Sequence, residues 1–214
     1  MKTIFFHIPK TNGRNVHIVV QQSLQLEILR LNKQYGDVMP IHGHRGFGLL
    51  DSEDIFGYTF IREPIQRAIS HWLHIHWDQP ANKFTPTILG NPDHHLVNYQ
   101  TKFISHSGLN IIPLEGNIEN FTADINLARK RIDKLKYVFR MEDSDRRLID
   151  NLRDILYDHL GLTKTFETPN VFPVNINPNT MKFYDSLTSS ELSELEDLFK
   201  IDIELYNTIN YSKV

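Results

Sequence analysis

Two short segments of this chain carry cations at positions where an apolar run passes into a helical pattern. Residues 7–15 contain Lys10, and residues 58–70 contain Arg62. A strand-to-helix turn presents unpaired backbone N–H groups and the positive end of a helix dipole, which together favour a phosphate. Two such turns side by side would hold a ligand with a phosphate at each end. The pattern therefore favours a nucleotide ligand.

In the first segment, Gly13 allows the backbone to approach a phosphate closely, and Lys10 adds a point charge beside it. The segment is not a Walker A motif, Gly-x-x-x-x-Gly-Lys-Ser/Thr, because the lysine precedes the glycine. Taken alone, the segment fits an ordinary surface lysine on an α/β turn equally well.

In the second segment, Arg62 ends a predicted strand, which is where ligands bind in open α/β sheets. Ser70 follows a little over two helical turns later, so its hydroxyl and the guanidinium can converge on one anion. Arginine can grip a phosphate through two parallel hydrogen bonds. An ion pair between Arg62 and Glu63 explains this segment more simply by itself, but the presence of both segments favours an anion site.

The elements that position these residues alternate between strands and helices, which predicts an α/β layered fold with a central parallel sheet. We expect one domain, residues 1–214. Strands are expected at 3–8, 54–61 and 137–140, and helices at 14–31, 64–76, 96–105, 124–135, 145–160 and from 188 past 205. Proline- and asparagine-rich turns are expected at 78–91, and a loop at 168–178.

Composition limits the classes of partner. The net charge of −3 gives no global attraction to nucleic acid or to an anionic membrane, so anion binding must be local. The absence of cysteine excludes disulfides, thiolate zinc sites and cysteine nucleophiles. No apolar run approaches the roughly 18 residues of a membrane span, and the start of the chain has no signal-peptide pattern. We therefore expect a cytoplasmic protein, and the sequence leaves its oligomeric state open.

Two motifs resemble a known family. His-Ile-Pro-Lys-Thr-x-Gly at 7–13 and Phe-Ile-Arg-x-Pro-x-x-Arg-x-x-Ser at 60–70 are similar to motifs of the carbohydrate (heparan-sulfate-type) sulfotransferases, which use 3'-phosphoadenosine-5'-phosphosulfate (PAPS). The likeness continues, in the family's order, at 43–44, 98–101, 137–142, 174–175 and 202–206. The resemblance implies a P-loop-kinase-like, three-layer α/β/α core.

The resemblance also implies roles for individual residues. Lys10 and Thr11, with Gly13, match the loop that holds the 5'-phosphosulfate, where Lys10 would stabilise charge on the bridging oxygen. Arg62 and Ser70 match the pair that grips the 3'-phosphate.

Three further residues are implied in the same way. Asn175 matches a later loop over the cofactor, and His44 matches the histidine that takes the proton from the acceptor hydroxyl. A histidine, with a pKa near ~6.5, suits that task. His42 lies two residues away and is the alternative base.

The first loop departs from the family pattern. The family continues after the glycine with Thr-Ser, which supplies two hydroxyls to the 5'-phosphate, whereas this chain has Arg14 and Asn15. Asn15 still offers one donor, and Arg14 adds charge. We include both, with Asn12, in the expected cofactor-binding loop. The change leaves the cofactor affinity open.

A cluster of histidines offers a competing interpretation. His71 and His74 share a helix face, and with His94 or His95 they could bind a metal ion. No established ligand spacing such as His-Glu-x-x-His is present, so we expect no metal and interpret His71, His74 and His76 as an aromatic-rich helix surface beside a substrate cleft.

The combined expectation is a PAPS-dependent sulfotransferase. It would move a sulfuryl group to a hydroxyl of a sugar or small-molecule acceptor by in-line displacement assisted by a histidine base, leaving 3'-phosphoadenosine 5'-phosphate. A nucleotide-dependent kinase on the same scaffold and a non-catalytic nucleotide-binding module are the alternatives. The sequence does not specify the acceptor.

Overall fold

The strands form a parallel sheet, as expected. The computed structural model describes residues 2–11, 16, 20, 24, 46–78, 80–106, 121–163 and 178–212. Within them, β1 (Lys2–Phe6), β2 (Ile55–Ile61) and β3 (Tyr137–Arg140) form a parallel three-stranded sheet in the order β1-β2-β3. Lys2 pairs with Ile55 and Tyr58 pairs with Tyr137, so the strands end at one edge.

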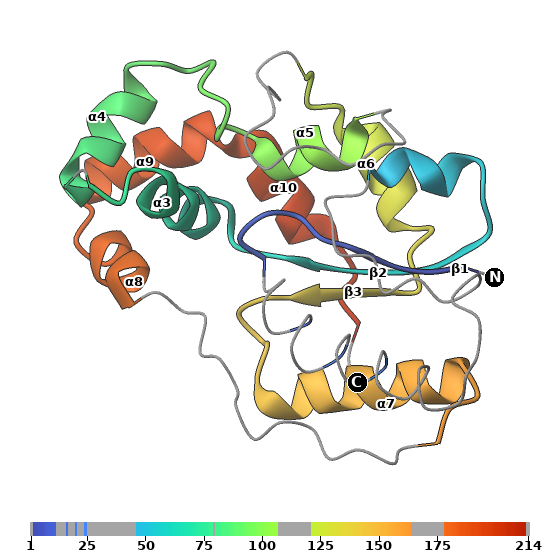
Figure 1. The fold of residues 1–214 in the computed structure, drawn as a ribbon. Coiled ribbons are helices and arrows are strands. Elements are labelled where there is room, and N and C mark those ends of the chain that lie inside the picture. Colours follow the sequence, from blue (N-terminus) through green and yellow to red (C-terminus); the bar gives the residue numbers. More distant parts are fainter. Residues whose placement is uncertain are drawn as a thin grey trace.

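Helices cover both faces of this sheet (Figure 1). They are α3 (Pro64–Ile75), α4 (Phe84–Leu89), α5 (Tyr99–Ser105), α6 (Ile125–Ile132), α7 (Arg146–His159), α8 (Pro178–Tyr184), α9 (Ser189–Leu198) and α10 (Lys200–Thr208), with the 3-10 turns η3 (Phe47–Asp51) and η4 (Ala81–Lys83). The mixed α/β class is confirmed for the part of the chain that the structure describes.

The alternation of side chains along the strands builds two cores. Ile4 and Phe6 of β1, with Val138 of β3, belong to a core that η3, α5, α6 and α10 complete. Phe5 of β1 and Phe60 of β2 belong to the core on the other face, which α7 completes with Ile149, Leu152 and Leu156. The buried residues Val16, Val20 and Leu24 also belong to this second core.

A third core lies beyond the carboxyl ends of the strands, between α3, α4 and α9 (Figure 1). An apolar stripe of α3 forms one side of it: Ile65, Ala68, Ile69 and Trp72 are all buried there. This packing fixes the orientation of α3, so that the opposite face of the helix, which carries Arg67, faces the turn that follows β1.

Several helices start and stop at residues with a clear local signal. Pro64 is at the first position of α3, and Asp145 caps α7 by accepting a hydrogen bond from the Leu148 N–H. Gly161 follows α7 with φ 60°, and Thr188 and Glu191 form a capping box at the start of α9.

Three expectations about helices were wrong. Part of 78–91, expected as turns, forms α4, because Phe84 and Ile88 are buried in the third core. Pro178, expected in a loop, begins α8. The single helix expected after residue 188 is two helices, α9 and α10, which are divided at the buried Phe199. The expected helix over 14–31 falls almost entirely outside the described residues.

In the described part of the chain, no helix combines the length and the apolar character that crossing a bilayer requires.

The start of α5 is held by α10. The Asp202 carboxylate, which is buried, accepts hydrogen bonds from the backbone N–H groups of Gln100 and Thr101 at 3.0 and 2.7 Å. The Asn98 side chain returns the contact by accepting from the Asp202 N–H at 3.0 Å. Asp202 therefore caps the N-terminus of α5, although it lies about a hundred residues away in the sequence.

We expect Asp202→Ala to lower the free energy of unfolding by about 2–4 kcal/mol, because two buried N–H groups lose their acceptor. Glu204→Ala on the same helix is the matched control. Glu204 forms an exposed ion pair with Arg129 at 2.8 Å, so its loss should cost no more than about 1 kcal/mol. Urea unfolding of both variants measures the difference, and equal losses would contradict this account of the cap.

Candidate anion-binding site

The turn after β1 has an unusual backbone conformation at Lys10. Its φ is 69°, a left-handed backbone conformation that residues other than glycine rarely adopt. The next residue fixes the turn, since both the N–H and the hydroxyl of Thr11 donate to the Ile8 carbonyl, at 3.2 and 2.6 Å. The fully buried Thr11 hydroxyl thus has a structural partner.

Arg62, directly after β2, is held by α5. Its backbone N–H donates to Gln100 Oε1 at 3.1 Å, and Gln100 Nε2 donates to the Arg62 carbonyl at 2.8 Å. This exchange fixes the backbone, and the 3% exposed Arg62 side chain reaches the turn after β1, where Nη1 lies 3.5 Å from the Lys10 carbonyl oxygen.

Arg67, one turn into α3, reaches the same turn. Its Nη1 donates to the Pro9 carbonyl at 3.4 Å and to His71 Nδ1 at 3.2 Å, and its guanidinium carbon lies 4.0 Å from the centre of the Tyr99 ring. Arg67 is fully buried, yet Nε and Nη2 have no hydrogen-bond partner among the described residues. A buried guanidinium with two unused donors is costly unless a ligand supplies acceptors.

In the described part of the chain, no carboxylate forms an ion pair with any of the three cations, Lys10, Arg62 and Arg67. Burial is the largest cause that lowers the pKa of each of them, and the charges of Arg62 and Arg67 lower the pKa of Lys10 further. The pKa of Arg67 falls to about 10.

Three carboxylates act on these cations through space without forming an ion pair in the described part of the fold: Asp202, whose charge raises the pKa of Arg67, and Glu63 and Glu142, which act on Arg62. Glu63 caps α3 by accepting from the Ile65 and Gln66 N–H groups at 3.0 and 2.6 Å. Glu142, just after β3, accepts from the Glu63 N–H at 2.7 Å and from the Tyr206 hydroxyl at 3.1 Å. Both raise the pKa of Arg62 through space, but less than burial lowers it.

These contacts join segments that are far apart in the sequence. Gln100 in 98–101 holds Arg62 in 58–70, and Glu142 in 137–142 holds Glu63. Residues 202–206 contact the two supporting segments: Asp202 accepts from the Gln100 N–H, and the Tyr206 hydroxyl donates to Glu142. The motifs that follow one another along the chain therefore form one hydrogen-bonded frame at the carboxyl ends of β1 and β2.

The face of α3 that carries Arg67 also carries histidines. His71 is buried, and its Nδ1 must accept from Arg67, because arginine has no acceptor. Burial, followed by the charge of Arg67, lowers the pKa of His71 to about 2. His74 is exposed, and the largest cause that lowers its pKa is the charge of Lys10. The charge of Lys10 therefore favours the neutral form of the exposed His74 imidazole.

The histidines do not form a metal site in the part of the chain that the structure describes, where no three histidine, aspartate or glutamate side chains are grouped to hold a metal ion. His71 faces His95 at 6.2 Å between ring centres and Tyr99 at 5.5 Å. The cations beside His71 would also repel a metal ion.

We expect the free energy of unfolding to fall at acid pH, because His71 is neutral in the folded protein and is protonated when the protein unfolds. The folded pKa of His71 lies below the usual value near ~6.5, so its contribution to stability is full above that pH and is lost as the pH falls towards about 2. We expect the unfolding free energy of the wild type to fall with decreasing pH more steeply than that of His71→Asn, by up to about 1.4 kcal/mol per pH unit. Urea titrations between pH 7.5 and 4 measure this, and identical slopes would contradict it.

Four of the predicted site residues lie in the described part. Lys10 and Arg62 meet at the turn after β1, and the Thr11 hydroxyl supports that turn. Ser70 lies on the α3 face that carries Arg67 and is 6% exposed; among the described residues, the hydrogen bonds of Arg62 go to Gln100 and to the Lys10 carbonyl and none joins it to Ser70. The remaining predicted residues lie outside the described residues: Asn12, Gly13, Arg14, Asn15, His42, His44 and Asn175.

The sequence prediction assigned no role to Arg67, Tyr99 or Gln100. A signal for Arg67 was present, because Arg67, Ser70, His71 and His74 follow the i, i+3, i+4, i+7 spacing of one helix face. Nothing local to α3 indicates that Tyr99 lies under the guanidinium.

Comparison with protein-family models, with curated proteins and with solved structures finds no match to this chain.

Proposed function

We propose that this protein binds PAPS at the carboxyl ends of β1 and β2 and transfers its sulfuryl group to the hydroxyl of a sugar or small-molecule acceptor. The proposal includes a P-loop-kinase-like core around the parallel sheet. The observation that carries it is the convergence of three buried or half-buried cations, Lys10, Arg62 and Arg67, without a carboxylate partner among the described residues.

The cations favour a ligand with more than one negative charge. Each charge pays a cost for leaving water, and the three repel one another. An anion between them offsets both costs through charge-assisted hydrogen bonds. The two unused donors of Arg67 need acceptors of the kind that a phosphate or sulfate oxygen provides.

The residues fit the two charged ends of PAPS. Lys10 and the turn that Thr11 fixes would hold the 5' end, and Arg62 with Ser70 would grip the 3'-phosphate. Arg67 lies between the turn and His71, and its charge would attract both the 5' end and the 3'-phosphate. When bound, PAPS supplies the activated sulfuryl group. Lys10 would then stabilise negative charge at the transfer centre.

A base must take the acceptor proton. His44, or His42, is proposed for this role from the family resemblance. Within the described residues, His74 offers a third candidate, because it is exposed and the charge of Lys10 favours its neutral form. Comparison of His44→Ala, His42→Ala and His74→Ala separates the three: loss of transfer with intact cofactor binding identifies the base.

The test is transfer of label from the cofactor to acceptors. The protein is incubated with ³⁵S-labelled PAPS, or with γ-³²P-labelled ATP, and a panel of glycans and hydroxylated metabolites. Incorporation of ³⁵S alone is expected. Incorporation of ³²P alone would replace the proposal with a kinase, and tight cofactor binding without transfer of either label would favour a non-catalytic binding module.

A further inference from the structure

Imidazole rings gather beside the second half of α3. His71 faces His95, which lies between α4 and α5, with the ring centres 6.2 Å apart and the rings nearly perpendicular. His95 stacks on His94 at 4.4 Å between ring centres. The ring of Trp72 joins the outer rings, because it lies 6.3 Å from His94 and 4.0 Å from His76. We call His71, His76, His94 and His95 the imidazole cluster.

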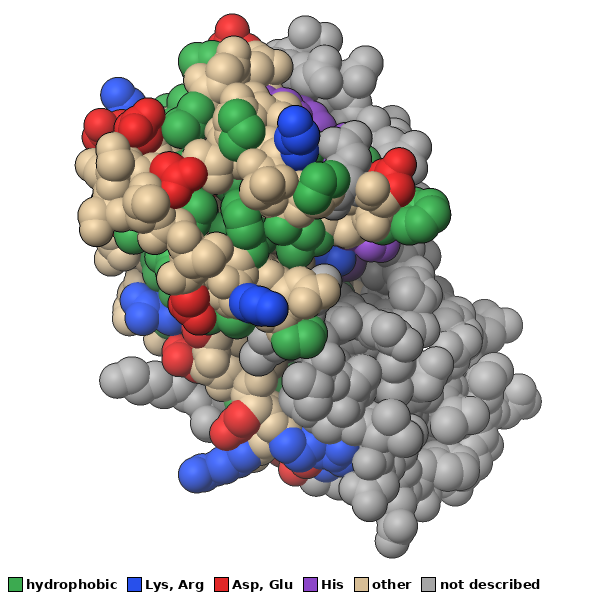
Figure 2. Space-filling model, turned by 90° about the vertical axis from the view of Figure 1, so that its left-hand side faces the viewer, with side chains coloured by type: hydrophobic (Ala, Val, Ile, Leu, Met, Phe, Trp, Pro, Cys, Tyr) green, Lys and Arg blue, Asp and Glu red, His purple; other side chains and the backbone are tan. Residues whose placement is uncertain are grey.

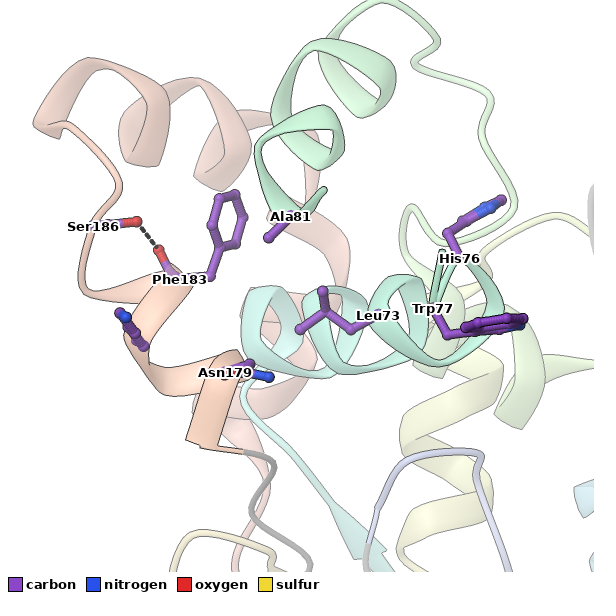
Figure 3. Close-up of a pocket in the computed structure, with 8 residues that line it drawn as sticks. Leu73, His76, Trp77, Ala81, Asn179, Phe183 and Ser186 are labelled. Atoms are coloured by element: carbon purple, nitrogen blue, oxygen red, sulfur yellow. Dashed lines mark hydrogen bonds between the residues drawn. The ribbon is translucent and has the colours of Figure 1, made fainter. Parts of the chain in front are cut away.

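Solvent reaches the outer part of the cluster. His71 is buried, whereas His76, His94 and His95 are half-buried. His76 also borders a pocket of about 560 Å³ between the end of α3 and α8, which Figure 3 shows. In that view the His76 ring points away from α8, on the side of the segment that joins α4 to α5. Figure 2 shows histidine side chains at the surface of this side of the molecule, next to lysine or arginine side chains. Protons from solvent therefore have access to the cluster.

Positive charges act on His95 from the elements around it. Burial is the largest cause that lowers the pKa of His95, to about 4, and the neighbouring His94 is the next. Arg67 and His76 of α3 and Lys102 of α5 lower this pKa further through their charges. A proton on His95 would add to an excess of positive charge. His95 is therefore neutral at pH 7 in the ligand-free protein.

His95 can change its charge more readily than His71, the inner ring. His71 Nδ1 accepts from Arg67 at 3.2 Å, so a proton at that nitrogen would break the hydrogen bond and bring two positive charges together. His71 is also buried, and the charge of Lys10 adds to burial and to the charge of Arg67 in lowering its pKa. Tyr99, 5.5 Å from His71, keeps its proton, because burial raises its pKa to about 12. The half-buried His95 is thus the ring beside the anion site that can respond to a ligand.

An anion held by Arg67 changes the electrostatic field at His95. Arg67 Nε and Nη2 are buried and have no partner among the described residues, so such an anion would accept from them. Its negative charge offsets the charge of Arg67, which is one of the causes that lower the pKa of His95, so this pKa rises. A group that is more basic in the complex takes up a proton on binding, and the affinity for the anion increases as the pH falls. The increase ends near pH 4, below which His95 is protonated with or without the anion.

We infer that the imidazole cluster couples anion binding at Arg67 to protons: His95 takes up a proton from solvent as the anion binds, so the protein holds anions more tightly in mildly acid than in alkaline solution. The anion and the proton enter together, and the proton leaves when the anion leaves. The inference rests on the part of the proposed function that places an anion at Arg67, and it is independent of the transfer reaction. It adds a regulation of the site by pH.

Sulfate is the probe, because it keeps both negative charges over the pH range used, so that any pH dependence belongs to the protein. Calorimetry at pH 5 in two buffers with different ionisation enthalpies measures the number of protons taken up per sulfate bound. We expect about 0.3–0.8 proton, and a Kd that falls about three- to tenfold from pH 7.5 to pH 5 at constant ionic strength.

Two histidine variants locate the proton. His95→Gln should take up less than about half as many protons as the wild type and lose most of the fall in Kd. His95→Asn replaces it if the first variant does not fold. His159→Gln, at the end of α7, is the matched control: its ring stacks on Phe56 at 3.8 Å, far from Arg67 in the fold, and the variant should match the wild type.

Absence of sulfate binding or of proton uptake by the wild type would overturn the inference, and so would uptake that persists in His95→Gln. In the last case His74→Gln and Glu63→Gln identify the group responsible. Glu63 is included because burial raises its pKa to about 6, within the range of the titration.

Titration with 3'-phosphoadenosine 5'-phosphate is done in parallel. If the nucleotide fails to bind while sulfate binds with His95-dependent proton uptake, the proposed function fails and the inference stands. If the nucleotide binds and sulfate binds without proton uptake, the reverse holds.

Discussion

Arg67→Met is expected to stabilise the ligand-free protein by about 1 kcal/mol and to weaken the binding of 3'-phosphoadenosine 5'-phosphate about tenfold or more. Burial that lowers the pKa of Arg67 to about 10 means that its charged form costs about 3 kcal/mol at neutral pH. The lost hydrogen bond to the Pro9 carbonyl and the lost packing of the side chain on the Tyr99 ring cancel about 2 kcal/mol of that gain.

Arg131 provides a matched control, because it is also buried but has a partner. It is 2% exposed, pairs with Asp51 at 2.7 Å and donates to the carbonyls of Ile104 and His106. Arg131→Met should destabilise the protein by about 2–4 kcal/mol, because the Ile104 and His106 carbonyls lose their donor and the exposed Asp51 carboxylate loses its ion pair. Nucleotide binding by the folded fraction should persist. If Arg67→Met destabilises the protein as much as Arg131→Met does, Arg67 serves the structure and not a ligand.

Lys10→Met is expected to lower the turnover number for sulfuryl transfer about 10²–10³-fold, because it removes a fixed charge at the transfer centre. Lys10→Gly should lose the same activity. Lys10→Gly should, however, be more stable than Lys10→Met by about 1 kcal/mol, since glycine adopts the observed φ of 69° without strain.

Turnover with labelled PAPS and denaturant unfolding of both variants check this prediction. Lys130→Met, at an exposed position on α6, is the control for loss of a lysine charge and should keep full activity. Normal turnover in Lys10→Met would remove Lys10 from the transfer centre. Equal stability of the two Lys10 variants would show that the left-handed conformation carries no strain.

The sheet and the longer helices could be predicted because their signals are local. The strand at 137–140 is short but apolar at its centre, and α7 has a cap at Asp145 and a stop at Gly161. The division between α9 and α10 could not be predicted, because the apolar pattern runs on through Phe199. α4, six residues long, has little helical signal of its own and owes its form to the burial of Phe84 and Ile88.

The site was predictable where one motif contains the chemistry. Lys10 and Arg62 each follow a strand, and the parallel sheet brings their turns together. Arg67 differs, because its importance comes from the absence of a carboxylate partner in the described part of the fold, which only tertiary structure reveals. The supports of the site, Gln100 and Glu142, likewise act through contacts that span about forty and eighty residues of sequence.

The most direct measurement is calorimetric titration of the protein with 3'-phosphoadenosine 5'-phosphate, adenosine 5'-phosphate and ATP at two salt concentrations. The account predicts that the first binds at least about tenfold more tightly than the other two and weakens as salt rises. It also predicts that Arg62→Met abolishes this preference by removing the 3'-phosphate contact. Tighter binding of ATP, or a preference that survives in Arg62→Met, would contradict the assignment of Lys10 and Arg62 to the two ends of this nucleotide.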